Sequence, residues 1–293
     1  MKLGFGVAVL AAAVLLGCNP RPVPVREAPP EVLRVATMNV HYILLEQAEG
    51  PWSVGGWEAR KGPLDAAFKA VDADVFAFQE MESFRRGDEG TVNLARDWLL
   101  AQNPGYAAGA TGDPAVFPST QPIFYRRDRL ELVDQGWFFF SETPDVIYSR
   151  TYNGGFPAFA SWAQFRDGDR LFRVLNVHND YASRSNRIRS SELIAERIRP
   201  WLEAGERVVV LGDFNSLRIG SAVRIVAEEG IDFVPVRGAT YHLNRGIGLF
   251  GAIDHIGLSA GVRLVGETQV IRQKFGAVWP SDHYPVLGDV LLE

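Results

Sequence analysis

The chain has 293 residues, of which 47% are hydrophobic and 22% are charged. This composition excludes a disordered or collagen-like protein, and a chain of this length can bury a large core without cross-links. The net charge of -5 argues against a protein that coats itself in nucleic acid, but it allows a nuclease with a local basic cleft. Cys18 is the one cysteine, so an intramolecular disulfide is excluded.

The N-terminal segment has the pattern of an export signal. Lys2 precedes an apolar run, residues 3–16, which is too short to span a bilayer and suits the core of a signal peptide. The run ends in Leu15-Leu16-Gly17-Cys18, which resembles the lipobox of bacterial lipoproteins. The resemblance implies a signal peptide over residues 1–17 and lipidation of Cys18. The alternative is a secretory peptide with an incidental cysteine.

Residues 18–31 are rich in proline and predict a semi-rigid tether between a membrane and the folded body. Asn19 stands where an aspartate usually retains lipoproteins at the inner membrane, which favours the outer membrane of a two-membrane bacterium. We therefore expect an extracytoplasmic, membrane-anchored bacterial lipoprotein. Its folded part is one domain over residues 32–293, and we expect it to be a monomer.

Strands and helices alternate along this domain. In chain order, hydrophobic periodicity predicts a strand at 32–40, a helix at 62–71, a strand at 74–79, a helix at 92–102, strands at 121–125, 130–140, 159–165 and 171–178, a helix at 190–202, a strand at 208–211, a helix at 221–229, and strands at 253–258, 262–270 and 285–291. We expect 121–125 to pair with 130–140, and 159–165 with 171–178. This order predicts an α/β domain with two packed sheets covered by helices.

Polar residues collect where the apolar strands end. A single such cluster is more often a turn or a helix cap, but buried polar groups need partners, and several clusters together indicate one shared site. The clusters are Met38-Asn39-Val40-His41, Gln79-Glu80, Asn176-Val177-His178-Asn179-Asp180, Gly212-Asp213-Phe214-Asn215, Asp254-His255 and Pro280-Ser281-Asp282-His283.

These clusters offer hard oxygen ligands and imidazoles. Carboxylates and amides suit Mg²⁺, Mn²⁺ or Ca²⁺. The domain contains no cysteine and no His-x-x-x-His spacing, so a zinc site is not expected. His178 and His283 could stabilise charge on a phosphate. The set therefore predicts metal-assisted hydrolysis of a phosphate ester.

The order and completeness of the clusters resemble the endonuclease/exonuclease/phosphatase (DNase I-like) superfamily over residues 32–293. This resemblance implies a four-layer α/β sandwich, in which two mixed β-sheets pack face to face with helices outside. It also implies that Mg²⁺ or Mn²⁺ is held by Asn39, Glu80 and Asp282.

The same resemblance implies catalytic roles for five residues. His178 would contact the phosphate and assist the leaving group, and His283 would contact the phosphate from another side. Asp213 and Asn215 would align or activate the attacking water, and Asp254 would orient His283. His41, His242 and His255 are expected to be packing or supporting residues.

Two segments depart from the family pattern. Asn179-Asp180-Tyr181 follows His178 where many members have a second histidine, so the groove differs. Phe159 precedes Ala160-Ser161-Trp162 where many members have an arginine, so any phosphate contact from that arginine is missing or comes from elsewhere.

The substrate remains open between alternatives. The leading hypothesis is that the protein is a phosphodiesterase, and among phosphodiesterases an extracellular nuclease is favoured. One alternative is a phospholipid or inositol-phosphate hydrolase. The other is a non-catalytic lipoprotein binding module. Basic clusters at 126–129 and 184–189 could steer a polyanion, although solvated turns and salt bridges are favoured. Trp52, Trp57 and Phe84 could stack on a base or meet lipid, or could simply pack.

Overall fold

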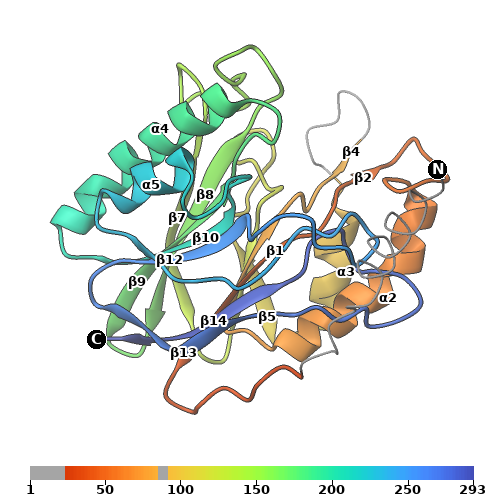
Figure 1. Ribbon diagram of the computed structural model, residues 1–293, viewed down its shortest axis with the longest axis horizontal. Helices are drawn as coiled ribbons and strands as arrows, with labels where there is room; N and C mark the ends of the chain where they lie inside the picture. Colours follow the sequence, from red (N-terminus) through yellow and green to blue (C-terminus); the bar gives the residue numbers. More distant parts are fainter. Residues whose placement is uncertain (1–23, 85–91) are drawn as a thin grey trace, which may run out of the picture.

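The computed structural model describes residues 24–84 and 92–293. The expected signal peptide, Cys18 and the first part of the expected tether lie outside these residues. Two six-stranded sheets form the body of the molecule, and a short parallel pair, β2 (Ile43–Leu44) with β4 (Ser83–Phe84), lies apart from them (Figure 1).

The first sheet pairs β1 with β3 in parallel, and its other neighbouring strands are antiparallel. Its strand order is β13 (Val262–Val270), β14 (Val286–Leu292), β1 (Leu33–Asn39), β3 (Val75–Gln79), β6 (Ile123–Arg126) and β5 (Tyr106–Gly109).

The second sheet has the same mixed character. Here β9 and β10 are parallel, and the other neighbours are antiparallel. Its strand order is β11 (Asp232–Phe233), β12 (Asp254–Leu258), β10 (Arg207–Asp213), β9 (Arg170–His178), β8 (Phe159–Asp167) and β7 (Glu131–Phe139).

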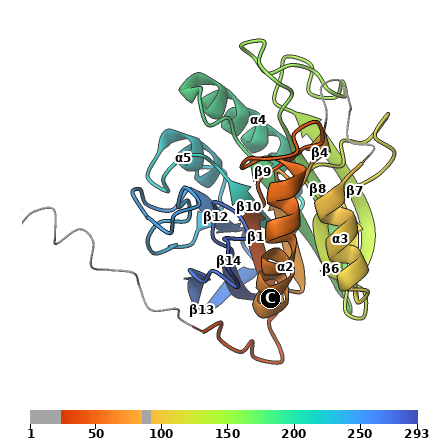
Figure 2. The same cartoon turned by 90° about the vertical axis from the view of Figure 1, so that its right-hand side faces the viewer.

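Helices cover both outer faces. The helices α2 (Val54–Val71) and α3 (Leu94–Gln102) lie side by side over the first sheet, and α4 (Arg184–Glu203) and α5 (Ser221–Ala227) lie over the second (Figures 1 and 2). Because each sheet has one face toward these helices and one toward the other sheet, three separate apolar layers form. The four-layer sandwich with two mixed sheets is therefore confirmed.

The alternation of side chains along the strands positions the polar ends. In β9, Phe172 and Val174 belong to the core between the sheets, and Leu175 and Val177 face the helix layer. Because successive side chains point to opposite faces, His178 continues the inner row. By the same rule Asn39, Asp213 and Asp254 extend the inner rows of their own strands.

The predicted hairpin of 121–125 with 130–140 is wrong. The chain crosses from the first sheet to the second between these strands, since β6 pairs with β3 and β5, whereas β7 pairs with β8. Arg129 stabilises the crossing, because its guanidinium lies 2.9 Å from Asp74 beside the first sheet and 3.1 Å from Asp167 at the end of β8. The hairpin of β8 with β9 is confirmed.

Residues 24–31 contain no regular element and run along the edge of the first sheet. Arg26 forms an ion pair of 2.8 Å with the buried Asp289 of β14, and Gln269 of β13 donates a hydrogen bond to the carbonyl of Pro24. This part of the expected tether therefore contacts the domain. Within the described residues, no helix is both long and apolar enough to cross a membrane.

Candidate active site

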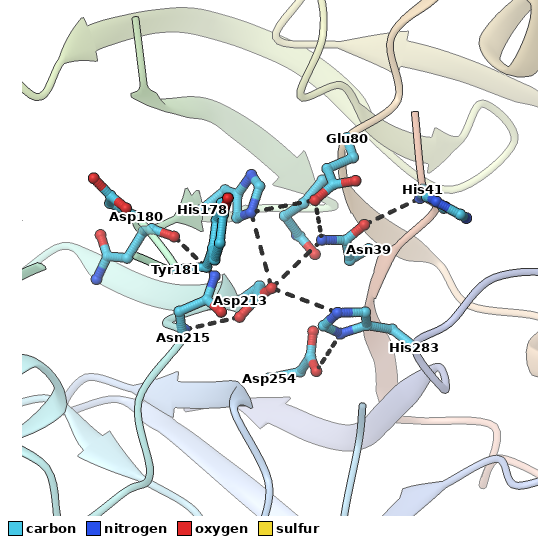
Figure 3. A network of polar contacts seen from close by, with 12 residues as sticks. Asn39, His41, Glu80, His178, Asp180, Tyr181, Asp213, Asn215, Asp254 and His283 are labelled. Carbon is cyan, nitrogen blue, oxygen red and sulfur yellow. Dashed lines mark hydrogen bonds and ion pairs between the residues drawn. The ribbon is translucent and has the colours of Figure 1, made fainter. Parts of the chain in front are cut away.

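Five strand ends meet at one edge of the sandwich. In the second sheet Asp213, the last residue of β10, lies opposite His178 of β9 and opposite Asp254 of β12. The ends of β1 and β3 in the first sheet carry Asn39 and, one residue beyond the strand, Glu80. Since the two sheets pack face to face, these side chains gather in one cluster (Figure 3).

Asp213 lies at the centre of the cluster (Figure 3). Its Oδ1 accepts a hydrogen bond of 2.8 Å from the backbone N–H of Asn215. Its Oδ2 lies 3.4 Å from Asn39 Nδ2, 3.9 Å from His178 Nε2 and 3.8 Å from His283 Nε2. One carboxylate oxygen is thus fixed by the turn after β10, and the other faces the remaining site residues.

The Nε2 atoms of the two imidazoles lie just beyond hydrogen-bond distance of the Asp213 carboxylate. His178 Nε2 lies 3.7 Å from Glu80 Oε1, and its distance to Asp213 is similar. Separations above about 3.5 Å are too long for direct hydrogen bonds. One oxygen atom, of water or of a phosphoryl group, can lie beside the carboxylate and the imidazole and contact both of them.

His283 and Asp254 form a buried pair. His283 Nδ1 lies 2.9 Å from Asp254 Oδ2, and both residues are buried. Burial lowers the pKa of His283, but the carboxylates of Asp254, Asp213 and Asp282 outweigh burial and raise it to about 10. The imidazole is therefore protonated at neutral pH and directs its Nε2 hydrogen toward Asp213.

The ionised form of the Asp213 carboxylate is disfavoured in this buried site. Burial and the nearby Asp254 carboxylate raise the pKa of Asp213 to about 6, against the opposing effects of His283 and His178. A carboxylate with a pKa close to neutral can both accept and release a proton under ordinary conditions. This is the electrostatic setting expected of a general base.

Asn39 and Glu80 lie together beside Asp213, and the segment of Asp282 is tied to the end of β1. Asn39 donates a hydrogen bond of 3.0 Å to Glu80 Oε1, and its own Oδ1 accepts from the backbone N–H of His41. The Ser281 hydroxyl donates to the carbonyl of Asn39, which draws the segment of Asp282 against β1. In this structure Asn39 thus orients Glu80. The carboxylates of Glu80 and Asp282 both accept hydrogen bonds from neighbouring groups, but within the described residues neither forms an ion pair with a lysine or arginine, so each can bind a cation.

The donor set fits a hard divalent cation. Four carboxylates share the site, and the buried Asp254 Oδ1 has no hydrogen-bond partner within the described part of the chain. The ligand atoms of Asp213, Asp254 and His283 also lie within 4.8 Å of one another, but the protonated His283 offers no lone pair, so this group can supply only its carboxylates. Excess negative charge with unpaired oxygen atoms is the chemistry that Mg²⁺ or Mn²⁺ neutralises. The identity of the ion does not follow from this geometry.

Three residues at the strand ends adopt left-handed backbone conformations, each within two residues of its strand. The φ angles are 62° at His41, 53° at Glu80 and 46° at Asn215. Such angles cost of order 1–3 kcal/mol for residues with a Cβ and concentrate at functional sites. At Gly212 φ is 141°, and an added Cβ would lie 2.0 Å from the carbonyl oxygen of Val177. Only glycine fits there.

Sequence reasoning missed Arg60. This buried side chain of α2 donates hydrogen bonds to the carbonyls of Val40, His41 and Pro280, so it joins the loop after β1 to the loop before His283. No pattern in the helix distinguishes it from the basic residues Lys61 and Lys69, because its partners are backbone atoms distant in the sequence.

A polar layer beneath the site was also missed as a structural unit. Gln79 donates a hydrogen bond of 2.7 Å across the two sheets to Asn176 Oδ1, and its side chain also contacts the Thr37 hydroxyl. Asn176 donates in turn to the carbonyl of Phe78. Gln79 and Asn176 stand in the clusters read from the sequence, but their pairing depends on how the sheets align.

The remaining candidates lie outside the cluster. His242 is buried against Tyr284, and His255 packs on Phe214, as expected of supporting residues. His41 points its ring away from Asp213 (Figure 3). The basic clusters are largely used in ion pairs and hydrogen bonds, including Arg126 with Asp72, Arg129 with Asp167, Arg187 with the carbonyl of Asp180, and Arg189 with Glu142.

Two mixed sheets packed face to face, with acidic and imidazole side chains at one shared edge, define an α/β sandwich with a polar site where the sheets meet. Residues 37–283 match the model of the Endonuclease/Exonuclease/phosphatase family, so the chain belongs to this family of hydrolases. The match ends at the site residue His283. Comparison with curated protein sequences gives no significant match.

Solved structures share the fold at low sequence identity. An endonuclease/exonuclease/phosphatase family protein from Bacteroides thetaiotaomicron has a TM-score of 0.74 and 23% identity, covering 92% of this chain and 100% of that one. A mannosyl-6-phosphatase from the same species has a TM-score of 0.74 and 24% identity, covering 88% and 99%. The human Nocturnin catalytic domain with bound sulfate has a TM-score of 0.63 and 15% identity, covering 91% and 97%.

Proposed function

We propose that this protein is a divalent-metal-dependent phosphoesterase that hydrolyses its substrate with water activated at Asp213. The observation that carries the proposal is the position of Asp213 Oδ2, which faces Asn39, His178 and His283 at 3.4 to 3.9 Å. A buried carboxylate flanked by two imidazoles can orient a water molecule toward a phosphoryl group that the imidazoles contact.

Each side chain then has a distinct task. Asp213 aligns the attacking water and accepts its proton at Oδ2, and the N–H of Asn215 holds the other oxygen in place. His283, kept protonated and oriented by Asp254, donates from Nε2 to a phosphoryl oxygen. His178, which is half-exposed, contacts the phosphate from the opposite side and donates a proton to the leaving oxygen.

Glu80 and Asp282 are the residues that would hold the cation, with Asn39 positioning Glu80. Mg²⁺ or Mn²⁺ bound there would neutralise the repulsion among the carboxylates and polarise the phosphate ester.

The charges around the site favour small esters over polyanions. The arginines of the two basic clusters are mostly engaged, and Arg126 and Arg129 lie at the start of β3, whereas Glu80 follows its end. A nucleic-acid strand needs several free cations along its path. The nuclease activity expected from the sequence is a prediction that these charges do not support. A compact ester with one phosphate group matches the charges around the site better than a nucleic acid does. The mannosyl-6-phosphatase activity of one structural neighbour is consistent with such a substrate.

The test is phosphate release and plasmid nicking by the purified protein with Mg²⁺, with Mn²⁺ and with chelator. The substrate panel contains sugar phosphates, glycerol phosphate, bis(p-nitrophenyl) phosphate, inositol phosphates, phospholipid vesicles and supercoiled plasmid. The proposal predicts metal-dependent hydrolysis that the His283→Ala variant loses by about 10²- to 10⁴-fold. A folded protein inactive on all of them, with either metal, would leave the binding-module alternative.

A further inference from the structure

An aromatic cluster lies beside the site, next to Glu80. Tyr42, Trp52 and Phe84 make up this aromatic cluster. The Tyr42 ring is nearly parallel to Trp52, with centroids 6.1 Å apart, and lies 5.4 Å from Phe84. The backbone N–H of Tyr42 is 3.4 Å from Glu80 Oε2, so the cluster adjoins the carboxylate that would hold the cation.

Backbone hydrogen bonds fix the three segments that carry the rings. Leu44 N–H donates to the carbonyl of Trp52 at 2.6 Å, and Leu45 N–H donates to the carbonyl of Phe84 at 2.9 Å. The next residue, Ser53, is buried and caps α2 through a hydrogen bond to Gly56 N–H. The rings are thus held in place before any ligand arrives, which reduces the entropy cost of binding.

The exposure of Trp52 is not explained by packing. Its side chain is 40% exposed, although the apolar core under the first sheet is completed by buried neighbours such as Ile43 and Trp57. An exposed indole in a rigid frame beside a catalytic site offers an apolar face to a ligand. Rings with such faces bind the C–H face of a sugar or the face of a base.

The position of the cluster selects between these ligands. Tyr42 belongs to the cluster, and its backbone N–H lies 3.4 Å from Glu80 Oε2, so a ring that contacts the cluster lies next to the phosphate site. The close approach of the cluster to Glu80 favours a ring joined to the phosphate through one carbon over a base separated from it by a ribose.

From these observations we propose that the aromatic cluster binds the pyranose ring of a sugar phosphate, with Trp52 stacking on its C–H face. The proposal rests on the proposed phosphoesterase function and names its substrate class. Trp52 is then a specificity residue, and the scissile phosphate lies among Glu80, His178 and His283.

The kinetic test compares glucose 6-phosphate with glycerol 3-phosphate, which has the same primary ester and no ring. In the Trp52→Ala variant the ratio of kcat/KM for these two substrates falls about 5- to 10-fold, through a higher KM for the sugar phosphate. The conservative Trp52→Phe variant restores the ratio, because it keeps a ring face in the same frame. An unchanged ratio in Trp52→Ala overturns the proposal while leaving the phosphoesterase function intact.

A binding test separates this proposal from catalysis. Saturation-transfer NMR with methyl α-D-glucopyranoside, a ring with no phosphate, reports contact with the wild-type protein and loses its signal in Trp52→Ala. The same measurement with adenosine is the contrast. If adenosine binds at Trp52 and the glucoside does not, the cluster takes a base and the proposal is wrong. Binding of the glucoside by a protein inactive on every ester would support the cluster while contradicting the phosphoesterase.

Discussion

The pKa of His283 depends on individual hydrogen bonds within the buried group formed by Asp213, Asp254 and His283. Asp254 has one oxygen on His283 Nδ1 and one buried oxygen without a hydrogen-bond partner in the described chain. The Thr240 hydroxyl accepts from the backbone N–H of Asp254 at 3.2 Å and so helps fix its position. The pKa of His283 therefore depends on a carboxylate that is itself held rigidly.

Replacing the Asp254 carboxylate tests whether it sets the pKa of His283. Asp254→Asn keeps the shape and removes the charge, so the pKa of His283 falls from about 10 and its protonated fraction at neutral pH decreases. We expect a loss of roughly 10²-fold in kcat/KM. NMR titration of the His283 ring against pH in the metal-free protein checks the shift, and an unchanged pKa would contradict the assigned role.

His242 gives a pH dependence of stability that is separate from catalysis. Burial lowers its pKa from 6.5 to about 4, so the folded state favours the neutral ring. Its contribution is complete above pH 6.5 and is lost as the pH falls from 6.5 toward 4. Urea unfolding at pH 7.5 and 5.5 should show a smaller decrease in stability, by about 1 kcal/mol, for His242→Phe than for the wild type. Equal decreases would refute this linkage.

The site residues were largely accessible from the sequence, because polar residues at the ends of apolar strands are conspicuous there. Asn39, Glu80, His178, Asp213, Asp254 and His283 are brought together as expected. Arg60 was not found, because its hydrogen bonds to backbone carbonyls leave no pattern. The orientation of the Asn39 amide could not be predicted from the sequence either, because it depends on a hydrogen bond from the backbone N–H of His41.

At the scale of elements, the periodic segments were predicted well and their junctions poorly. The helix expected at 62–71 begins at Val54, because Ser53 provides an N-cap that outweighs Gly55, Gly56 and Pro63 in the sequence pattern. The predicted pairing of β6 with β7 is wrong because it was inferred from their adjacency along the chain. The two strands belong to different sheets, and Arg129 between them forms ion pairs with carboxylates beside both sheets. Short strands such as β5 and β11 carry too few residues to show a period.

The parallel pair β9 and β10 depends on Gly212. An added Cβ would lie 2.0 Å from Val177 O, so Gly212→Ala must displace the strand that presents His178 or the one that presents Asp213. We expect destabilisation above about 3 kcal/mol in chemical unfolding. The matched control is Gly168→Ala at the β8–β9 turn, where φ is 59° and nothing lies within 4 Å of the new Cβ. It should cost about 1 kcal/mol. Equal effects would contradict the close approach.

At the scale of the whole molecule, the proposed export and anchoring follow from residues 1–31. The sequence predicts lipidation of Cys18, and the described part of the following segment ends against β13 and β14 through Arg26. If the protein is a lipoprotein, the Cys18→Ser variant expressed in a bacterial host loses incorporation of labelled palmitate and is released from the membrane fraction. Labelling of the variant equal to the wild type would show that Cys18 is not the lipidated residue.

The central claim is that hydrolysis of a phosphate ester takes place at Asp213. The most direct measurement is the rate of Mg²⁺-dependent phosphate release by the Asp213→Asn variant beside Asp134→Asn, which removes an exposed carboxylate from β7. The site geometry predicts a loss of about 10³-fold or more for Asp213→Asn and a rate close to wild type for Asp134→Asn. Near wild-type hydrolysis by a folded Asp213→Asn protein would show that the reaction occurs elsewhere.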